Sequence, residues 1–270
     1  MPADSSVPVW FLGVWKLEWI RQQGEPPTDT RIVRDIQTPI VFGSVRIPRD
    51  RPSFPHATSL ADLTDAELAG LLTQKGFSGS TSFEGLVSTW RRDIDYQPPG
   101  APDIGRLERV SPSSVYEHAL DDSFTEYWWS LSSGDGKFLG VKILRGQRAD
   151  RILSVAGDHF VFARNRAKDL PPADSLADLV AKTHPTRETL LEYLDCELSY
   201  GLVRGGRVPW EIRISTLPWR EGTQLELASQ IAIDPATGTL SPRDARPSGE
   251  TWTYPVNTMT VEDLKILFGR

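Results

Sequence analysis

The sequence predicts an all-β protein with a few short helices, and three observations support this prediction. In Val9–Trp19, apolar residues alternate with Lys16 and Glu18, as in an extended chain with one buried face. Further on, segments of strand length are separated by short polar turns, which is the spacing of antiparallel hairpins. Nine tryptophans are spread over the 270 residues, and large aromatic side chains suit pleated surfaces and barrel interiors.

The individual elements follow from the period of the apolar residues. We expect about a dozen strands and three or four helices, because alternating segments bounded by Pro or Gly indicate strands and helical spacing after a capping residue indicates helices. The expected helices are Asp62–Gln74, Leu176–Lys182, Arg187–Leu194 and Val261–Phe268. The expected strands include Val9–Trp19, Thr30–Thr38, Ile40–Ile47, Ser82–Asp95, Ser114–Leu120, Ser123–Leu131, Phe138–Leu144, Arg151–Ala156, His159–Arg164, Glu197–Val203, Trp210–Leu217 and Thr251–Tyr254.

The apolar face of the first strand needs a closed or sandwiched β core, since a lone hairpin cannot bury it. The chain is long enough for one large β domain or two small ones. We predict a β-barrel with an inserted helix over residues 1–110 and a second barrel with a terminal helix over residues 111–270. A single larger barrel is the alternative.

Composition excludes several classes of partner. The net charge of −6 argues against nucleic acid, because phosphate binding needs a concentrated basic surface. The amino terminus lacks the pattern of a signal peptide and no run of about 18 apolar residues occurs, so we expect no membrane segment and a cytoplasmic protein. Cys196 is the only cysteine, which rules out an intramolecular disulfide and a thiolate metal cluster.

Several short motifs resemble a known superfamily. Gly13-Val14-Trp15, on the first strand, resembles the Gly-x-Trp signature of the lipocalin and calycin superfamily. Four further motifs are similar to those of little-characterised bacterial and fungal two-domain lipocalin-like proteins. They are Gln37-Thr38-Pro39 leading to Val45-Arg46-Ile47-Pro48, then Ile94-Asp95-Tyr96-Gln97-Pro98, Glu126-Tyr127-Trp128, and Ser215-Thr216-Leu217-Pro218-Trp219-Arg220.

The resemblance implies lipocalin-like antiparallel barrels, two small ones packed together, each a cup around an apolar cavity, with Trp15 at the floor. It implies no reaction. Secreted lipocalins usually carry signal peptides and disulfides, so an extracellular carrier role does not transfer to this chain.

Motifs for cofactors and metals are absent. The sequence has neither GxxxxGK[ST] nor GxGxxG, and its four histidines form no H-x-H or H-E-x-x-H pair. We therefore expect no metal and no cofactor. A single-histidine haem site, as in some small intracellular barrels of the same superfamily, remains open.

The candidate acid and base residues lie in two neighbouring strands. Glu126 shares a strand face with Phe124 and Trp128, where burial would raise its pKa and suit it to proton transfer. The preceding strand offers Glu117 on one face, and His118 with Tyr116 on the other. Solvated outer positions are the alternative, because carboxylates on strands are mostly exposed or paired.

A second candidate group lies on the strand that ends near Asp95. Trp90 and Arg92 share one face, so a guanidinium would lie beside an aromatic wall, while Arg91 and Asp95 lie on the other. We expect these charged residues either to line the interior of a barrel or to form a ladder of ion pairs on its outside. The charged residues of the proline-rich segment are interpreted as a solvated loop, with a positively charged rim as the alternative; they are Arg46, Arg49, Asp50 and Arg51.

Three hypotheses for function follow. The leading one is a protein that encloses a small apolar or aromatic molecule, with Trp90, Phe124, Trp128, Arg91 and Asp95 as ligand contacts. The alternative is a cofactor-independent isomerase, lyase or hydratase that uses Glu126, Glu117, His118 and Tyr116 as acid and base and Arg92 to stabilise negative charge. The third is an interaction module with a filled interior. An open cavity with Glu126 and Arg92 facing inward would favour catalysis over carriage.

Overall fold

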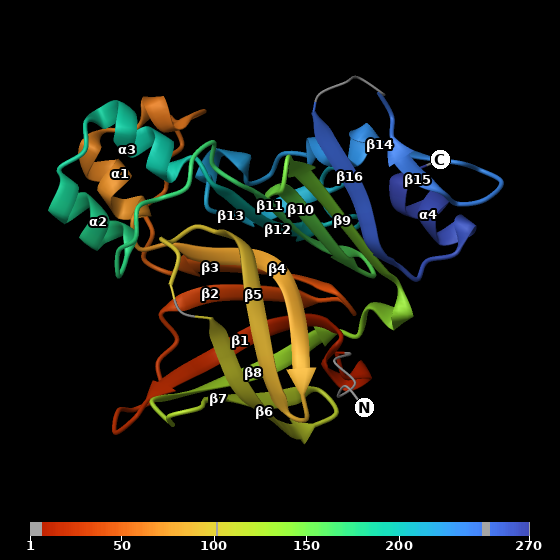
Figure 1. Cartoon of the computed structure of the whole chain (residues 1–270), viewed down its shortest axis with the longest axis horizontal. Helices are drawn as coiled ribbons and strands as arrows, with labels where there is room; N and C mark the ends of the chain where they lie inside the picture. Colours follow the sequence, from red (N-terminus) through yellow and green to blue (C-terminus); the bar gives the residue numbers. More distant parts are fainter. Residues whose placement is uncertain (1–6, 101, 245–248, 270) are drawn as a thin grey trace.

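The amino-terminal half forms a closed antiparallel barrel of eight strands (Figure 1). The structure is a computed structural model that describes residues 7–100, 102–244 and 249–269. Each barrel strand pairs with its neighbours in sequence, and β8 pairs back with β1, so that the sheet closes on itself. The strands are β1 (Gly13–Gln22), β2 (Arg31–Gln37), β3 (Val41–Pro48), β4 (Lys75–Glu84), β5 (Val87–Asp95), β6 (Asp103–Ser111), β7 (Ser114–Ala119) and β8 (Phe124–Ser132).

One end of the barrel is closed by the segment before β1. Val9–Phe11 is a short 3-10 helix rather than the start of the strand. The Phe11 ring packs on Trp15 with 5.5 Å between centroids, and Trp15 Nε1 donates to the Phe11 carbonyl at 2.9 Å. Trp15 is buried there among further aromatic side chains, so it forms part of the floor.

A β-bulge in β1 changes which residues face the interior. The register between β1 and β8 shifts between Leu17 and Trp19, which inserts one extra residue. Ile20 therefore lines the interior, and Trp19 stacks on Tyr127 with 5.4 Å between ring centroids. The expectation that Trp19 shares the buried face of Leu17 is wrong, because one inserted residue moves all later side chains to the opposite face.

The second half forms an open six-stranded sheet and not the expected second barrel. Its strand order is β13-β12-β11-β10-β9-β16, and a separate two-stranded sheet, β14-β15, lies beside it (Figure 1). The strands are β9 (Phe138–Arg145), β10 (Arg148–Ala156), β11 (His159–Arg164), β12 (Glu197–Leu202), β13 (Glu211–Ser215), β14 (Ile231–Ile233), β15 (Leu240–Pro242) and β16 (Glu250–Asn257).

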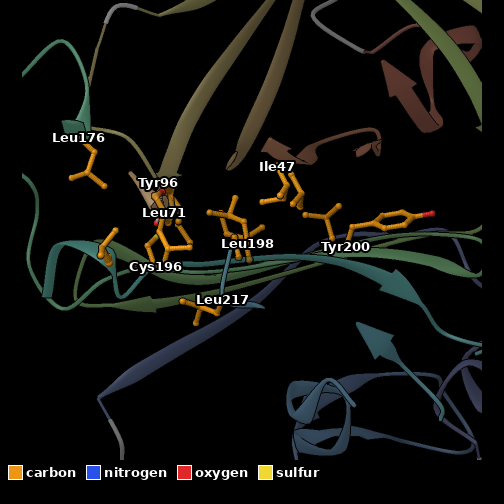
Figure 2. Close-up of a cluster of buried hydrophobic side chains, with 14 of the residues drawn as sticks. Ile47, Leu71, Tyr96, Leu176, Cys196, Leu198, Tyr200 and Leu217 are labelled. Carbon is orange, nitrogen blue, oxygen red and sulfur yellow. Dashed lines mark hydrogen bonds between the residues drawn. The ribbon is translucent and has the colours of Figure 1, made fainter. Parts of the chain in front are cut away.

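Both faces of this sheet are covered, which explains why it stays open. One face packs on the outside of the barrel, where Ile47 and Tyr96 meet Leu198 and Tyr200 in a shared core (Figure 2). The other face, with Phe160 among its residues, packs under the carboxyl-terminal helix and β14-β15. A sheet with two apolar faces is stable as the middle layer of three and has no interior to close around.

Strands β7 and β8 complete the first barrel, which therefore extends to Ser132. A division of the chain at residue 110 falls within β6. The linker between the two layers is instead the short segment from Ser132 to Phe138, which contains a 3-10 helix at Gly134–Gly136.

Four short helices flank these layers: α1 (Asp65–Leu71), α2 (Leu176–Thr183), α3 (Arg187–Leu194) and α4 (Val261–Phe268). The predicted capping box of α1 is present, since Thr64 Oγ1 accepts from the Glu67 amide and Glu67 accepts from the Thr64 amide. The expected helix over Asp62–Gln74 is too long at both ends, because Thr64 caps its start and the helix ends at Leu71. Within the described part of the chain, no helix has the length and apolar character needed to cross a bilayer.

Candidate functional site

The barrel contains a cavity of about 970 Å³ at the end opposite the 3-10 helix. Its apolar wall is formed by inward side chains, among them Leu17, Val33, Phe77 and Phe124. The mouth lies between the β1–β2 hairpin, the loop after β5 and the segment that leads into α2. Its residues are Thr28, Asp29, Thr30, Arg31, Pro98, Pro99, Gly100, Pro172, Ala173, Asp174 and Ser175.

Two glutamates lie side by side inside this cavity. Glu117 on β7 and Glu126 on β8 are direct cross-strand partners, and both line the cavity. Their exposed fractions are only 6% and 4%. Gly105 on β6 leaves the space that Glu117 fills, since a Cβ atom there would lie 2.9 Å from the Glu117 side chain. The pair is therefore held close together and away from bulk water.

Arg46 connects this pair to a third carboxylate. Its Nη1 donates to Glu126 Oε1 at 3.1 Å, and its Nε donates to Ser44 Oγ, also at 3.1 Å. Ser44 in turn donates to Asp35 Oδ1 at 2.5 Å. The guanidinium also lies over the rings of Phe77 and Trp128, at 5.1 and 5.4 Å from their centroids.

A second arginine, Arg92 on β5, lies on the other side of β4 from Arg46. Arg92 donates to Asp95 at 3.0 Å and to Asp103 at 2.6 Å, and its guanidinium lies 3.9 Å from the centroid of Phe77. Phe77 is thus contacted by both inner arginines. Because Arg92 already has two carboxylate partners, its charge is balanced within the wall of the cavity. Its guanidinium N–H groups are therefore not free to donate to a ligand as a fork.

These environments shift the ionisation of the carboxyl groups. Burial, followed by repulsion from Glu126 and Asp103, raises the pKa of Glu117 well above its usual value. Burial also raises the pKa of Asp35 to about 7, although Arg46 and Ser44 oppose the shift. Burial alone would lower the pKa of Arg46, but Glu126 and Asp35 outweigh it and the pKa is raised. The cavity therefore holds Glu117, which burial shifts toward its protonated form, next to Glu126, which is paired with Arg46.

One acceptor of this cluster is unused. Within the described residues, Glu126 Oε2 is buried and has no hydrogen-bond partner, and neither has Trp128 Nε1 on the same strand. A buried acceptor without a partner costs free energy unless a ligand or water satisfies it. The Glu126 carboxylate can thus accept a hydrogen bond or a proton from a molecule in the cavity.

The structure brings together half of the residues expected from the sequence. Glu117, Glu126, Arg92, Asp95 and Phe124 all line the large cavity. Trp90 and Trp128 lie beneath it, at a small inner space of about 20 Å³ near the floor.

Tyr116, His118 and Arg91 lie outside the barrel. His118 contacts Glu108 at 3.1 Å through Nε2, and Tyr116 packs on Tyr127 with 5.1 Å between ring centroids. The Arg91 side chain is 80% exposed. These placements follow from strand alternation, because each of the three directly precedes or follows an inward-facing residue.

Sequence reasoning missed Arg46 and Asp35 as cavity residues. Arg46 was interpreted as part of a solvated segment, but β3 extends to Pro48 and its alternate residues Phe42, Ser44 and Arg46 face inward. The alternation of Val33 and Asp35 in the neighbouring strand β2 was the sequence pattern that could have indicated these inward positions. It was weak because polar residues occupy both faces of β2 and β3.

The described residues of the site show no arrangement suited to a metal or haem. Among the described residues, no group of three or more His, Cys, Asp or Glu side chains is placed to hold a metal ion. None of the four histidines, all of them in the described part, lines the cavity, so an axial histidine for haem does not fit there.

Comparisons with known proteins add little to this description. No protein-family model and no curated protein sequence matches the chain. One solved structure, a lipocalin-like protein from Bacteroides uniformis, aligns with 45% of this chain and 99% of its own, at 11% sequence identity and a TM-score of 0.30. The closed eight-stranded barrel itself is the architecture that the lipocalin resemblance implies.

Proposed function

We propose that the barrel binds a small organic molecule with an aromatic or apolar body in the cavity above Trp15. The proposal is carried by one observation: an open cavity of about 970 Å³ is lined by Glu126, whose carboxylate oxygen Oε2 is buried and has no partner among the described residues. Ligand sites are typically concave, have apolar walls and contain a few directed polar groups. Phe77 and Phe124 supply the wall, and Glu117 and Glu126 supply the polar groups.

Binding can be tested with a matched pair of variants on β8. Phe124 lines the cavity, whereas Trp129 on the outer face is 41% exposed. We expect aromatic fragments, detected by ligand-observed NMR with the full chain, to bind about tenfold more weakly to Phe124→Ala, since a lost aromatic contact costs about 1 kcal/mol or more. Trp129→Ala should bind like the wild type. Fragments that respond to Trp129→Ala and ignore Phe124→Ala would place the binding outside the barrel.

A second candidate is a cofactor-independent isomerase, lyase or hydratase acting on the bound molecule. The specific observation in its favour is the Glu117–Glu126 pair, because two carboxyl groups whose environments differ can act as acid and base. In this reaction, Glu126 takes a proton from the substrate and Glu117 gives its proton to another atom of the same substrate. The neighbouring carboxyl groups then exchange the proton and the pair is reset.

The charged lining favours this chemistry over simple carriage. A carrier of an apolar molecule gains nothing from carboxyl groups such as Asp103, Glu117 and Glu126 inside its cavity, since each must be desolvated or paired. Burial raises the pKa of Glu117 well above its usual value, and it raises the pKa of Asp35, beside the small inner space, to about 7, which is the direction that proton transfer at neutral pH requires.

Separate measurements of binding and turnover distinguish these functions. Native mass spectrometry of the purified full chain identifies the retained small molecule, and that compound is then assayed with Glu126→Gln. The enzymatic outcome is a loss of turnover by 100-fold or more, on the order expected for general acid–base catalysis, with affinity within about threefold of the wild type. Unchanged turnover in Glu126→Gln would rule out this residue as the base.

A further inference from the structure

Two cations at the mouth of the cavity differ from those inside it. Arg31 on β2 and Lys75 on β4 both line the cavity, on the strands that flank Arg46. Within the described residues, neither has a carboxylate within ion-pair distance, and Arg31 donates only to the carbonyl of Thr73 at 2.9 Å. Arg46 and Arg92, deeper in the barrel, each have carboxylate partners.

Two acidic residues of the cavity opening are held in ion pairs with other residues. Asp29 pairs with Arg49 at 2.7 Å, and Asp95 pairs with Arg92. Asp174 acts on Lys182, which is held by Asp178 at 2.8 Å. Arg31 is attracted by Asp50 and Lys75 by Asp95, but among the described residues neither cation has a carboxylate within ion-pair distance.

Burial and the neighbouring positive charges shift the pKa of both side chains. Burial, followed by repulsion from Arg31, Arg46 and Arg92, lowers the pKa of Lys75. Burial and repulsion from Arg46 lower the pKa of Arg31. The repulsion between like charges in a partly enclosed site is relieved when an anion binds between them.

We propose that the ligand of the barrel is an organic acid whose carboxylate lies at the mouth between Arg31 and Lys75. This inference rests on the proposed binding function and adds the orientation of the ligand. The carboxylate takes the fork of donors from Arg31 and a point charge from Lys75, and the apolar body lies along Phe77 and Phe124. The inner end, with a donor group such as hydroxyl, reaches Glu126 Oε2.

The test uses two fluorescent probes that differ only in charge. Pyrenebutyrate carries a carboxylate and pyrenebutanol carries a hydroxyl on the same aromatic body, and each is titrated into the full chain. We expect the carboxylate to bind at least about tenfold more tightly, since a charge-assisted hydrogen bond contributes roughly 1.5–3 kcal/mol. The variants Lys75→Met and Arg31→Met should each remove most of this preference and leave the affinity for pyrenebutanol within about twofold.

A matched control separates local from general charge effects. Lys168, on the surface, pairs with Glu192 at 3.0 Å and does not line the cavity, so Lys168→Met should change neither affinity. If both probes bind equally and the mouth variants change nothing, the organic-acid proposal is overturned while the binding function stands. If neither probe binds, or if both respond to Trp129→Ala and not to Phe124→Ala, the binding function itself fails.

Discussion

At the scale of one residue, the protonation of Asp35 affects the stability of the fold. Its carboxyl group accepts from Ser44, lies near Arg46 and has a pKa of about 7 because of burial. In the unfolded chain, an aspartate has a pKa of about 3.9. Between these two values the folded protein keeps a proton that the unfolded chain has lost, so a rise in pH favours the unfolded state.

The stability that protonated Asp35 contributes is therefore fully present below pH 4 and is lost as the pH rises through about 7. We predict that Asp35→Asn gains stability relative to the wild type between pH 5 and pH 8, by up to about 3 kcal/mol, since each pH unit contributes about 1.36 kcal/mol. Urea denaturation at several pH values measures the difference.

The control for this prediction is Asp121→Asn. Asp121 is exposed and Ser123 lowers its pKa, so both states are ionised throughout this range. Its effect on stability should not change between pH 5 and pH 8. A constant difference for Asp35→Asn over the same range would mean that Asp35 is ionised in the folded protein.

Elements that depend on local sequence were predictable. The hairpin strands β7 to β11 and the capped helices α2, α3 and α4 agree with the expectations to within a few residues, because turns, caps and alternation act over short distances. The bulge before Trp19 was not predictable in this way. It depends on how β1 meets β8, more than 100 residues later, and it decides which aromatic side chains enter the barrel.

Gly13 at the start of β1 shows why a Gly-x-Trp pattern suits this barrel. Its φ is +127°, and a Cβ atom there would lie 2.2 Å from the carbonyl oxygen of Ser132 at the end of β8. We predict that Gly13→Ala lowers the free energy of unfolding by about 3 kcal/mol, from backbone strain and from displacement of β8. Chemical denaturation followed by tryptophan fluorescence measures this loss.

Gly24 in the β1–β2 turn is the control that separates backbone strain from displacement of β8. Its φ is +80°, but no atom lies within 4 Å of the position that a Cβ would take. Gly24→Ala should cost only about 1 kcal/mol, the strain of the left-handed backbone alone. Equal losses of unfolding free energy in the two variants would show that the close approach of Gly13 to β8 does not contribute to stability.

At the scale of the whole molecule, the arrangement of the second sheet could not be predicted from the sequence. Strand β16 pairs with β9, about 110 residues earlier, and alternation does not reveal such partners. Both halves are rich in hairpins, which suggested two barrels. What distinguishes them is the buried outer face of the first barrel, where Val41, Val45 and Ile47 meet the second sheet.

This shared core predicts that the barrel and the second sheet unfold as one unit. Leu198 is fully buried between the two layers, whereas Leu139 is equally buried on the far face of the sheet, under α4 (Figure 2 shows Leu198). Replacing either leucine by alanine should cost about 2–5 kcal/mol. If the layers are coupled, Leu139→Ala weakens the barrel as much as Leu198→Ala does, although Leu139 lies in the core on the far side of the sheet.

Amide hydrogen exchange in β3 measures this coupling, because β3 belongs to the barrel and packs on the second sheet. Under conditions where the slowest amides exchange by global unfolding, both variants should lower β3 protection by the same free energy that urea denaturation reports. If Leu139→Ala leaves β3 protection unchanged, the barrel is a separate folding unit. The cavity would then survive without the second sheet, and the mouth residues contributed by the segment before α2 would be dispensable for its stability.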